Sequence, residues 1–228
     1  MVINKSYYIN LNSRSDRRLQ MESQIGKIPI LKQMERYSAI NGEKIDYTKE
    51  KLECEIYETK RPGFKLGKSM TKGAYGLCQS LLDIYKKNII NNYGNILICE
   101  DDCIFVKDFE NKFNEYIKHL PQDWDMVHFG YLKSDLVIKE KINEYYSTYE
   151  YKPGNQCFLV TKKACEILFV NLNKPIQPSD SDMSERVVRK GLLKCYISNE
   201  RLGYQIDGDD SNTIPKGSKK FYYDKEKK

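Results

Sequence analysis

The 228-residue sequence lacks the signals that mark several classes of protein. No stretch approaches the roughly 18 apolar residues of a membrane-spanning helix, and the N-terminus has neither the basic start nor the long apolar run of a signal peptide. There is also no GxxxxGK[ST] loop, which disfavours a P-loop phosphoryl-transfer enzyme. We therefore expect a soluble, cytoplasmic protein without a transmembrane segment.

The seven cysteines form no CxxC pair, although several lie within apolar runs. These are Cys78, Cys99, Cys157 and Cys165. We interpret them as reduced core residues, which indicates a reducing compartment.

Charged residues of both signs are abundant, with 38 Lys and Arg against 32 Asp and Glu and a net charge of +6. The mild basic excess favours anionic ligands such as phosphates. Because lysines and acids are interspersed and no recognition motif is present, we expect no nucleic-acid partner. The length and the 40% hydrophobic content predict a single globular domain over residues 1–212, followed by a basic, flexible tail at 213–228.

Apolar residues recur at strand and helix spacing in alternation along the chain. We expect strands near residues 6–11, 36–40, 95–99, 123–131, 155–160 and 194–198, and helices near 13–28, 71–91, 108–119, 161–172 and 179–191. Such alternation predicts an α/β fold with a mostly parallel central sheet and flanking helices. Residues 43–70 are expected to form a long loop that serves a site or is mobile, and residues 132–153 a hairpin.

Three consecutive acids, Glu100, Asp101 and Asp102, follow the apolar run at 96–99. In an extended backbone Glu100 and Asp102 would share a face and Asp101 would point away. Two carboxylates roughly 6–7 Å apart in a partly dry crevice repel by about 2–3 kcal/mol at an effective dielectric near 20. Protonation, pairing with Arg or Lys, or a divalent cation would relieve this repulsion, and such oxygen ligands suit Mg²⁺ or Mn²⁺ bridging a diphosphate. The alternative is a strand-end turn with solvated acids.

Further segments accompany these acids in a fixed order: YYINLNSRSDRR, SAING, KGAYGLCQSLLDIYKK, NILICEDDCIF, DWDMVHFGY and FLVTKKACEIL. The ordered set resembles glycosyltransferase family 25, which includes bacterial lipooligosaccharide and collagen hydroxylysine galactosyltransferases, over about residues 6–212. The resemblance implies a GT-A fold, a UDP-hexose donor (most often UDP-galactose, alternatively UDP-glucose), Mn²⁺ or Mg²⁺, and transfer with inversion. The acceptor would be a hydroxyl of a glycan or of hydroxylysine.

The resemblance also assigns roles to individual residues. Asp102 would bind the metal, with Glu100 as a further ligand or a water-mediated one, and Asp101 would contact ribose or sugar hydroxyls. The late segment GYQIDGDDSNT offers Asp207, Asp209 or Asp210 as another metal ligand, with Asp209 as the first choice; a flexible acidic turn is the alternative. The donor-binding residues of the earlier segments would be Asn10, Arg14, Arg17, Ala39, Asn41, Gly42, Gly73, Gly76 and Ser80. Among these segments, SAING (38–42) resembles the one that lines the nucleotide base in the family. The alternative for Arg17 is an exposed helix start, and for residues 38–42 an ordinary turn. For Gly73, Gly76 and Ser80 it is a helix that packs on the sheet through small residues.

An inverting transfer needs a base for the acceptor hydroxyl. The segment PIQPSDSDM resembles the family's Pro-x-Asp segment, which makes Asp180 the first choice and Asp182 the second; helix capping is the alternative. Leu81 stands where the family has a histidine, so a non-catalytic nucleotide-sugar-binding relative is the competing hypothesis. We expect His128 and Tyr131 to be core residues.

Overall fold

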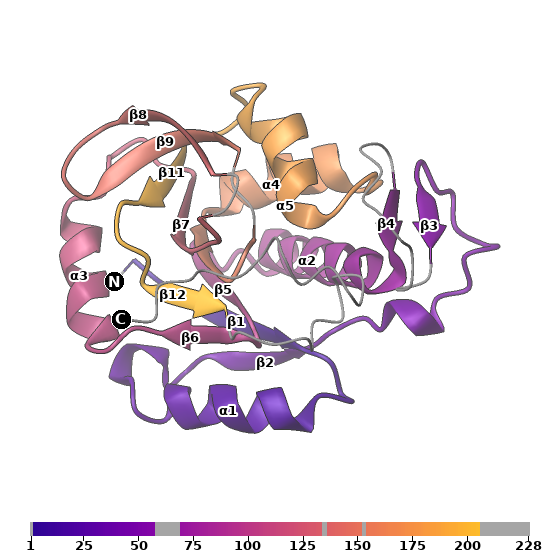
Figure 1. Ribbon diagram of the computed structural model, residues 1–228, viewed down its shortest axis with the longest axis horizontal. Coiled ribbons are helices and arrows are strands. Elements are labelled where there is room, and N and C mark those ends of the chain that lie inside the picture. Colours follow the sequence, from indigo (N-terminus) through magenta and orange to yellow (C-terminus); the bar gives the residue numbers. More distant parts are fainter. Residues whose placement is uncertain (1, 58–68, 134–135, 152–153, 206–228) are drawn as a thin grey trace.

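The computed structural model describes residues 2–57, 69–133, 136–151 and 154–205 (Figure 1). Ten strands in this part of the chain form one sheet, in which β2, β1, β5, β10, β7, β11, β9 and β8 follow one another and β12 pairs with both β6 and β7. Their bounds are β1 (Lys5–Asn10), β2 (Glu35–Ser38), β5 (Ile96–Glu100), β6 (Cys103–Phe105), β7 (Met126–Gly130), β8 (Val137–Lys141), β9 (Tyr146–Tyr151), β10 (Cys157–Val160), β11 (Cys195–Ser198) and β12 (Gly203–Gln205).

The sheet is mixed, so the prediction of a mostly parallel sheet is wrong. Strand β1 is parallel to β2 and β5, and β7 is parallel to β11 and β12. Strand β10 is antiparallel to both β5 and β7, and the pairs β9–β11, β8–β9 and β6–β12 are also antiparallel. Strands β7 and β10 are buried along their whole length. That pattern is common in parallel sheets, and it carries no information about strand direction.

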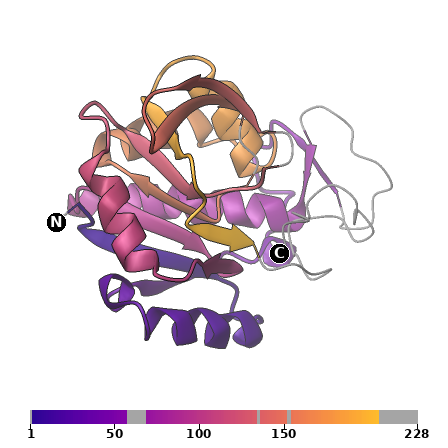
Figure 2. The same cartoon turned by 60° about the vertical axis from the view of Figure 1, so that its left-hand side comes forward.

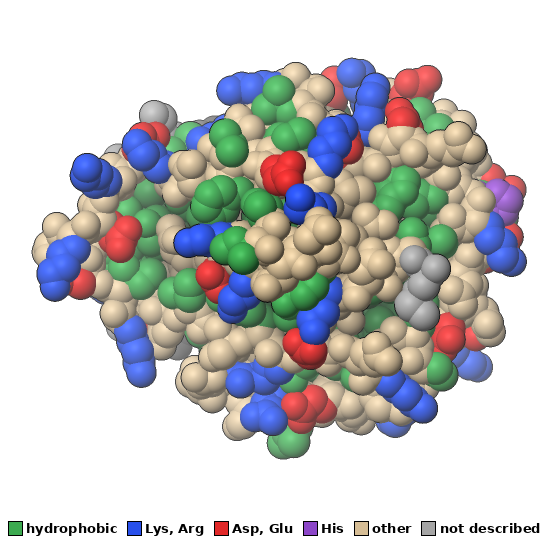
Figure 3. All heavy atoms as spheres, turned by 180° about the vertical axis from the view of Figure 1, so that it is seen from behind, with side chains coloured by type: hydrophobic (Ala, Val, Ile, Leu, Met, Phe, Trp, Pro, Cys, Tyr) green, Lys and Arg blue, Asp and Glu red, His purple; other side chains and the backbone are tan. Residues whose placement is uncertain are grey.

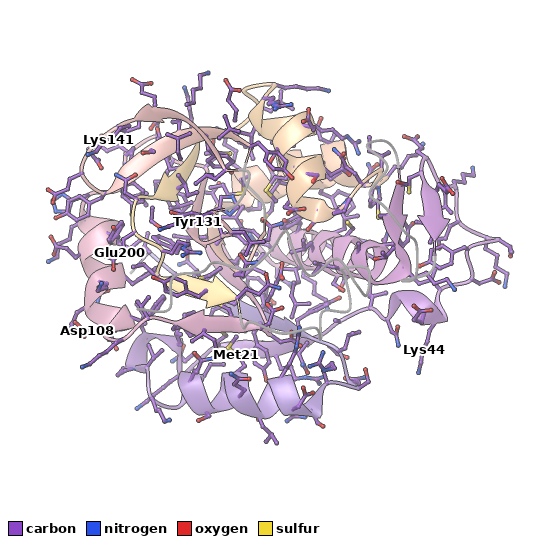
Figure 4. The ribbon with its side chains drawn as sticks, in the orientation of Figure 1. Met21, Lys44, Asp108, Tyr131, Lys141 and Glu200 are labelled. Atoms are coloured by element: carbon purple, nitrogen blue, oxygen red, sulfur yellow. The ribbon has the colours of Figure 1, made fainter. Side chains whose placement is uncertain are left out.

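Helices cover both faces of the sheet because alternate strand residues point to opposite sides. Ile96 and Ile98 pack in a cluster with α2, α4 and α5, whereas Leu97 and Cys99 pack in a second cluster with α1 and α3. Figure 4 shows Met21, which is fully buried, between α1 and the sheet. The α-helices are α1 (Ser15–Ile25), α2 (Lys72–Asn91), α3 (Phe109–Lys118), α4 (Lys162–Leu172) and α5 (Ser179–Met183). Two short 3-10 helices, η1 (Pro29–Leu31) and η2 (Gly42–Lys44), and a π-helix, η3 (Ser184–Val188), accompany them.

Threonines begin the two helices that pack together behind the sheet. The hydroxyl of Thr71 accepts a hydrogen bond from the Ala74 amide, and the hydroxyl of Thr161 accepts one from the Ala164 amide. Each is an N-cap that satisfies an amide left unpaired at a helix start. The helices predicted near 71–91 and 161–172 are therefore confirmed.

The predicted long loop at 43–70 contains short regular elements within its described residues. Strands β3 (Glu55–Tyr57) and β4 (Ser69–Thr71) form a parallel pair beside one end of α2, which Figure 1 shows at the right. Met70 of β4 is buried together with Ala74 and Tyr75 of α2. The hairpin predicted at 132–153 is confirmed by β8 and β9. The predicted tail at 213–228 lies outside the described residues.

All seven cysteines are free, and all except the partly buried Cys54 are buried, as expected for reduced core residues. In the described ranges no helix is both long enough and apolar enough to cross a membrane. Figure 3 shows lysines, arginines and acids interspersed over the face opposite to that of Figure 1.

Candidate functional site

Polar residues gather where several central strands end. Strands β1 and β5 run parallel and end at Asn10 and Glu100, and β7 runs in the same direction because both β5 and β7 are antiparallel to β10. The carboxyl ends of these strands and the amino end of β10 therefore lie at one sheet edge. Figure 2 shows β12 running along this part of the molecule beside β6. In α/β sheets, ligands bind beyond the carboxyl ends of the strands.

The three acids do not continue the strand. The chain turns at Asp101 and Asp102 between β5 and β6, and we call residues 100–102 the acidic turn. Both Asp101 and Asp102 face Arg17, whose Nη1 lies 3.0 Å from Asp101 Oδ1 and 3.1 Å from Asp102 Oδ2. The expectation that Asp101 would point away from Asp102 is therefore wrong, because it assumed an extended backbone. In the structure, the repulsion between these two carboxylates is relieved by their pairing with Arg17.

Asn10 holds the second oxygen of Asp101. Its side chain is 1% exposed, and Nδ2 donates to Asp101 Oδ2 at 2.6 Å and to the Arg14 carbonyl at 3.0 Å. Arg14 itself forms a bidentate ion pair with Asp16. Its hydrogen bonds hold the pKa of Asp16 below its usual range. Asn10 and Arg17, both predicted from the sequence, thus meet at the acidic turn, while Arg14 lies alongside.

Two residues that the sequence did not single out complete the arrangement. Arg36 on β2 donates from Nε to Asn10 Oδ1 at 2.8 Å. Gln205 on β12 donates to Asp102 Oδ2 at 3.4 Å and accepts from Gln156 Nε2 at 3.3 Å. Arg36 and Gln205 reach this site only because β2 pairs with β1 and β12 pairs with β6. Neither strand register can be predicted from the sequence.

Asp102 has the surroundings of a cation ligand. Its side chain is 5% exposed, and burial raises its pKa; Arg17 opposes this shift and Asp101 adds to it. Oδ1 of Asp102 is buried and has no hydrogen-bond partner among the described residues. A buried carboxylate oxygen without a donor is costly, and a hard divalent cation would satisfy it. The residues present therefore fit the implied Mn²⁺ or Mg²⁺.

The other predicted metal ligands are less defined. Glu100 ends β5 and is partly exposed, whereas Asp209 lies outside the described residues. Within the described ranges, no three or more His, Cys, Asp or Glu residues are grouped as a metal site. A cation at Asp102 would therefore take most of its ligands from elsewhere, as expected where a substrate diphosphate supplies oxygens.

The predicted base-lining segment SAING packs directly on α2. A Cβ on Gly42 would lie 1.8 Å from the Lys72 carbonyl oxygen, and one on Gly76 would lie 2.5 Å from the Ile40 carbonyl oxygen. Ser80 is fully buried and accepts a hydrogen bond from the Ile40 amide at 2.9 Å. Gly42, Gly76 and Ser80 thus have a packing role, and contact with a ligand stays a prediction for them.

The remaining donor-binding candidates lie around this contact. Asn41 caps η2 by accepting from the Glu43 amide at 3.0 Å, and Ala39 and Gly73 are partly exposed beside it. The Ala39 amide donates to the Asn10 carbonyl at the end of β1, and binding of a ligand by Ala39, Asn41 and Gly73 stays a prediction.

The two candidate bases have different surroundings. Asp180 is partly exposed and accepts a hydrogen bond from the Gly154 amide at 2.6 Å, just before β10 begins. Asp182 is 1% exposed, accepts from the Ile176 amide at 3.1 Å and pairs with Arg186 at 3.3 Å. Burial raises the pKa of Asp182, which these two contacts counteract. Asp182 therefore stabilises the local fold, and Asp180 is the better placed to meet a substrate.

Leu81, His128 and Tyr131 are core residues. Leu81 is 3% exposed and lines a small pocket between α2 and α5 together with Asp182. His128 is fully buried against Tyr149 and Phe158, and the Tyr131 hydroxyl donates to the Ser198 carbonyl. The predictions for His128 and Tyr131 are confirmed.

Comparison with known proteins identifies the family. Residues 3–183 match glycosyltransferase family 25, described as an LPS biosynthesis protein family. No curated protein matches the sequence. Among solved structures, A197 from STIV is 12% identical (TM-score 0.42, covering 90% of this chain and 86% of that one). Mannose-1-phosphate geranyltransferase from Thermus thermophilus is 7% identical (TM-score 0.41, 87% and 74%). Neither similarity is strong enough to bear on function, but the family match spans most of the sequence, and the chain belongs to glycosyltransferase family 25.

Proposed function

We propose that the protein is a metal-dependent inverting glycosyltransferase of the GT-A type, which moves a hexose from a UDP-sugar to a hydroxyl group of an acceptor. Galactose is the first choice and glucose the alternative. The family's description favours a lipopolysaccharide-type glycan as acceptor over hydroxylysine. The observation that carries the proposal is the buried Asp102 carboxylate at the sheet edge, whose Oδ2 pairs with Arg17 and whose Oδ1 has no hydrogen-bond partner among the described residues.

The residues at this edge suit a diphosphate leaving group. Glycosyl transfer passes through an oxocarbenium-like transition state while the departing nucleoside diphosphate gains negative charge. Asp102 would hold the divalent cation, which supplies Lewis-acid neutralisation of that charge when bound. Arg17 and the amino end of α1 add positive potential beside Asp102, so both favour an anionic group there.

Asp180 is the proposed base for the acceptor hydroxyl. One of its oxygens accepts from the Gly154 amide and the other from the Ser181 amide, so the carboxylate has a fixed orientation. The same stretch of chain leads into Gln156, which contacts Gln205 and through it Asp102. The candidate base and the candidate metal ligand thus flank one segment, residues 154–157. A carboxylate held beside the donor site can remove a proton as the hydroxyl attacks.

A screen of nucleotide release tests the proposal. UDP-, GDP- and CMP-sugars are incubated with Mn²⁺ or with excess chelator, with and without saccharide acceptors. We expect release from a UDP-hexose that depends on Mn²⁺ and is abolished in Asp102→Ala. Glu140→Ala, which removes an exposed acid from β8, serves as the control and should retain full activity. Full activity of Asp102→Ala, or of the wild type in chelator, would refute the metal-dependent mechanism.

The competing function is a non-catalytic nucleotide-sugar-binding relative. Its supporting observation is Leu81, which stands at the family's histidine position and is buried among apolar side chains, where it can donate no hydrogen bond. Binding of UDP-sugar with Mn²⁺ in calorimetry, without hydrolysis or transfer to any acceptor tested, would favour this alternative.

A further inference from the structure

We propose that Arg36 is a positioning residue of the candidate donor site: acting through Asn10, it fixes the orientation of Asp101 and hence the arrangement of the acidic turn around Arg17. The inference rests on the proposed function and adds to it a residue that touches neither donor nor metal. It is carried by an unbroken series of hydrogen bonds from Arg36 to Asp102.

The carboxamide of Asn10 is the central link. Its oxygen accepts from Arg36 Nε at 2.8 Å, and its nitrogen donates to Asp101 Oδ2 at 2.6 Å and to the Arg14 carbonyl at 3.0 Å. In the flipped orientation, the amide nitrogen would face the guanidinium, which can only donate, and the amide oxygen would face a carboxylate, which can only accept. Because Asn10 is 1% exposed, water has little access to replace the lost contacts. Arg36 and the Arg14 carbonyl therefore favour the same orientation of Asn10, the one in which it can hold Asp101.

The positions of the three acceptors around Arg36 require a guanidinium group. Besides the Nε contact, Arg36 Nη2 donates to the Asn10 carbonyl at 3.3 Å and to Asn12 Oδ1 at 2.5 Å. The parallel register sets Arg36 opposite Tyr8, two residues before Asn10, so the side chain reaches along β1 to its end. Three acceptors in different directions match a planar guanidinium with several donors, whereas the ammonium of a lysine is a point charge on a flexible stem.

The consequence reaches Asp102 through Arg17. One nitrogen, Arg17 Nη1, is shared between Asp101 Oδ1 and Asp102 Oδ2. If Asp101 loses its contact with Asn10, its carboxylate can rotate and draw Arg17 with it, which changes the charge that faces Asp102. Removal of a residue that hydrogen-bonds to a metal ligand and orients it typically weakens metal affinity by about 10–100-fold.

The test is a double-mutant cycle. Binding of UDP in the presence of MnCl₂ is measured by calorimetry for the wild type, Arg36→Lys, Arg36→Met, Asn10→Ala, and the variant that combines Arg36→Met with Asn10→Ala. We expect Arg36→Met, Arg36→Lys and Asn10→Ala each to weaken binding about tenfold or more, and the double variant to be no weaker than Asn10→Ala alone. Arg18→Met, which removes an exposed arginine paired with Glu22 on α1, is the matched control and should bind like the wild type.

A second readout needs no nucleotide. In ¹H–¹⁵N spectra, we expect the side-chain amide signals of Asn10 to shift in Arg36→Lys and Arg36→Met but not in Arg18→Met. Wild-type affinity in Arg36→Lys, additive effects in the cycle, or unmoved Asn10 amide signals would each overturn the positioning role. If the wild type binds no UDP with Mn²⁺, the proposed function fails, and the amide signals then decide alone whether Arg36 orients Asn10.

Discussion

Asp180 and Asp182 lie two residues apart on one short helix, yet their surroundings differ. Asp180 is partly exposed, with its oxygens held by backbone amides. Asp182 is buried, and it joins α5 to the preceding segment through Ile176 and to the next turn through Arg186. At the scale of single residues, solvent access separates a candidate base from an acid that holds the fold.

The burial of Asp182 predicts a pH dependence of stability. Because burial raises the folded-state pKa above the unfolded value of about 3.9, the folded protein binds the Asp182 proton more tightly. Stability from this group is therefore highest at low pH and is lost as the pH rises from about 4 through the folded pKa. Asp182→Asn keeps an acceptor for the Ile176 amide and removes the titration. We expect it to gain stability relative to the wild type as the pH rises from 3 to 7, measured by urea unfolding.

Asp16→Asn is the control, because the pKa of Asp16 is shifted in the opposite direction from that of Asp182. The pKa of Asp16 is lowered by its hydrogen bond with Arg14, so its contribution is present above the unfolded pKa and is lost as the pH falls. This variant should lose stability relative to the wild type as the pH rises. A parallel pH course for Asp182→Asn and Asp16→Asn would contradict the assignment.

The residues of the candidate site that could be predicted from the sequence stand at strand ends. Asn10, Asp101 and Asp102 directly follow or end apolar runs, and such positions meet at a sheet edge whatever the details of packing. Arg36 and Gln205 were not predictable in this way. Each depends on the register between strands that are distant in sequence, which local patterns do not specify.

Among the secondary-structure elements, β6 determines where the acidic turn lies. One side of β6 pairs with β12, and the other is bonded by Gln24 of α1, whose amide accepts from the Phe105 N–H at 2.9 Å and donates to the Cys103 carbonyl at 3.0 Å. A single side chain thus takes the place of a neighbouring strand. The same contact fixes α1, and therefore Arg17, relative to Asp101 and Asp102.

Replacement of Gln24 should weaken this junction. Gln24→Leu keeps the bulk of the side chain but leaves two buried backbone groups of β6 without partners, and we expect a loss of about 1–3 kcal/mol in the free energy of unfolding. Gln20→Leu, at an exposed position on the same helix, is the matched control and should change stability by less than about 0.5 kcal/mol. Equal stability of the two variants in urea denaturation would show that β6 does not depend on α1.

Element types were largely predictable from the sequence, and their directions were not. Helical periodicity and the Thr71 and Thr161 caps define α2 and α4, and apolar runs define β5 and β7. Strand β10 is antiparallel to both of its neighbours, and its continuous apolar run carries no information about that direction. The small sheet of β3 and β4 was missed because each strand has only three residues.

On the scale of the whole molecule, the candidate site joins distant parts of the chain. Its residues run from Asn10 in the first strand to Gln205 in the last described one, and the two core clusters pack against opposite faces of the same sheet. A ligand at the acidic turn would contact residues that come together only in the folded chain. Its binding energy should therefore appear as stability of the whole domain.

Thermal unfolding measures this coupling. With UDP and Mn²⁺ at about 100 times the dissociation constant, linkage contributes about 2.7 kcal/mol, which raises the midpoint of a chain of this length by about 5–11 °C. We expect this shift in the wild type by differential scanning fluorimetry, and none in Asp102→Ala, because Asp102 is the proposed ligand of the cation that would bind the diphosphate. GDP with Mn²⁺ should give a smaller shift if the segment at 39–42 selects uracil. An equal shift with UDP in excess chelator would mean that the nucleotide binds without a cation. The buried Oδ1 of Asp102 would then not serve as a cation ligand for UDP binding.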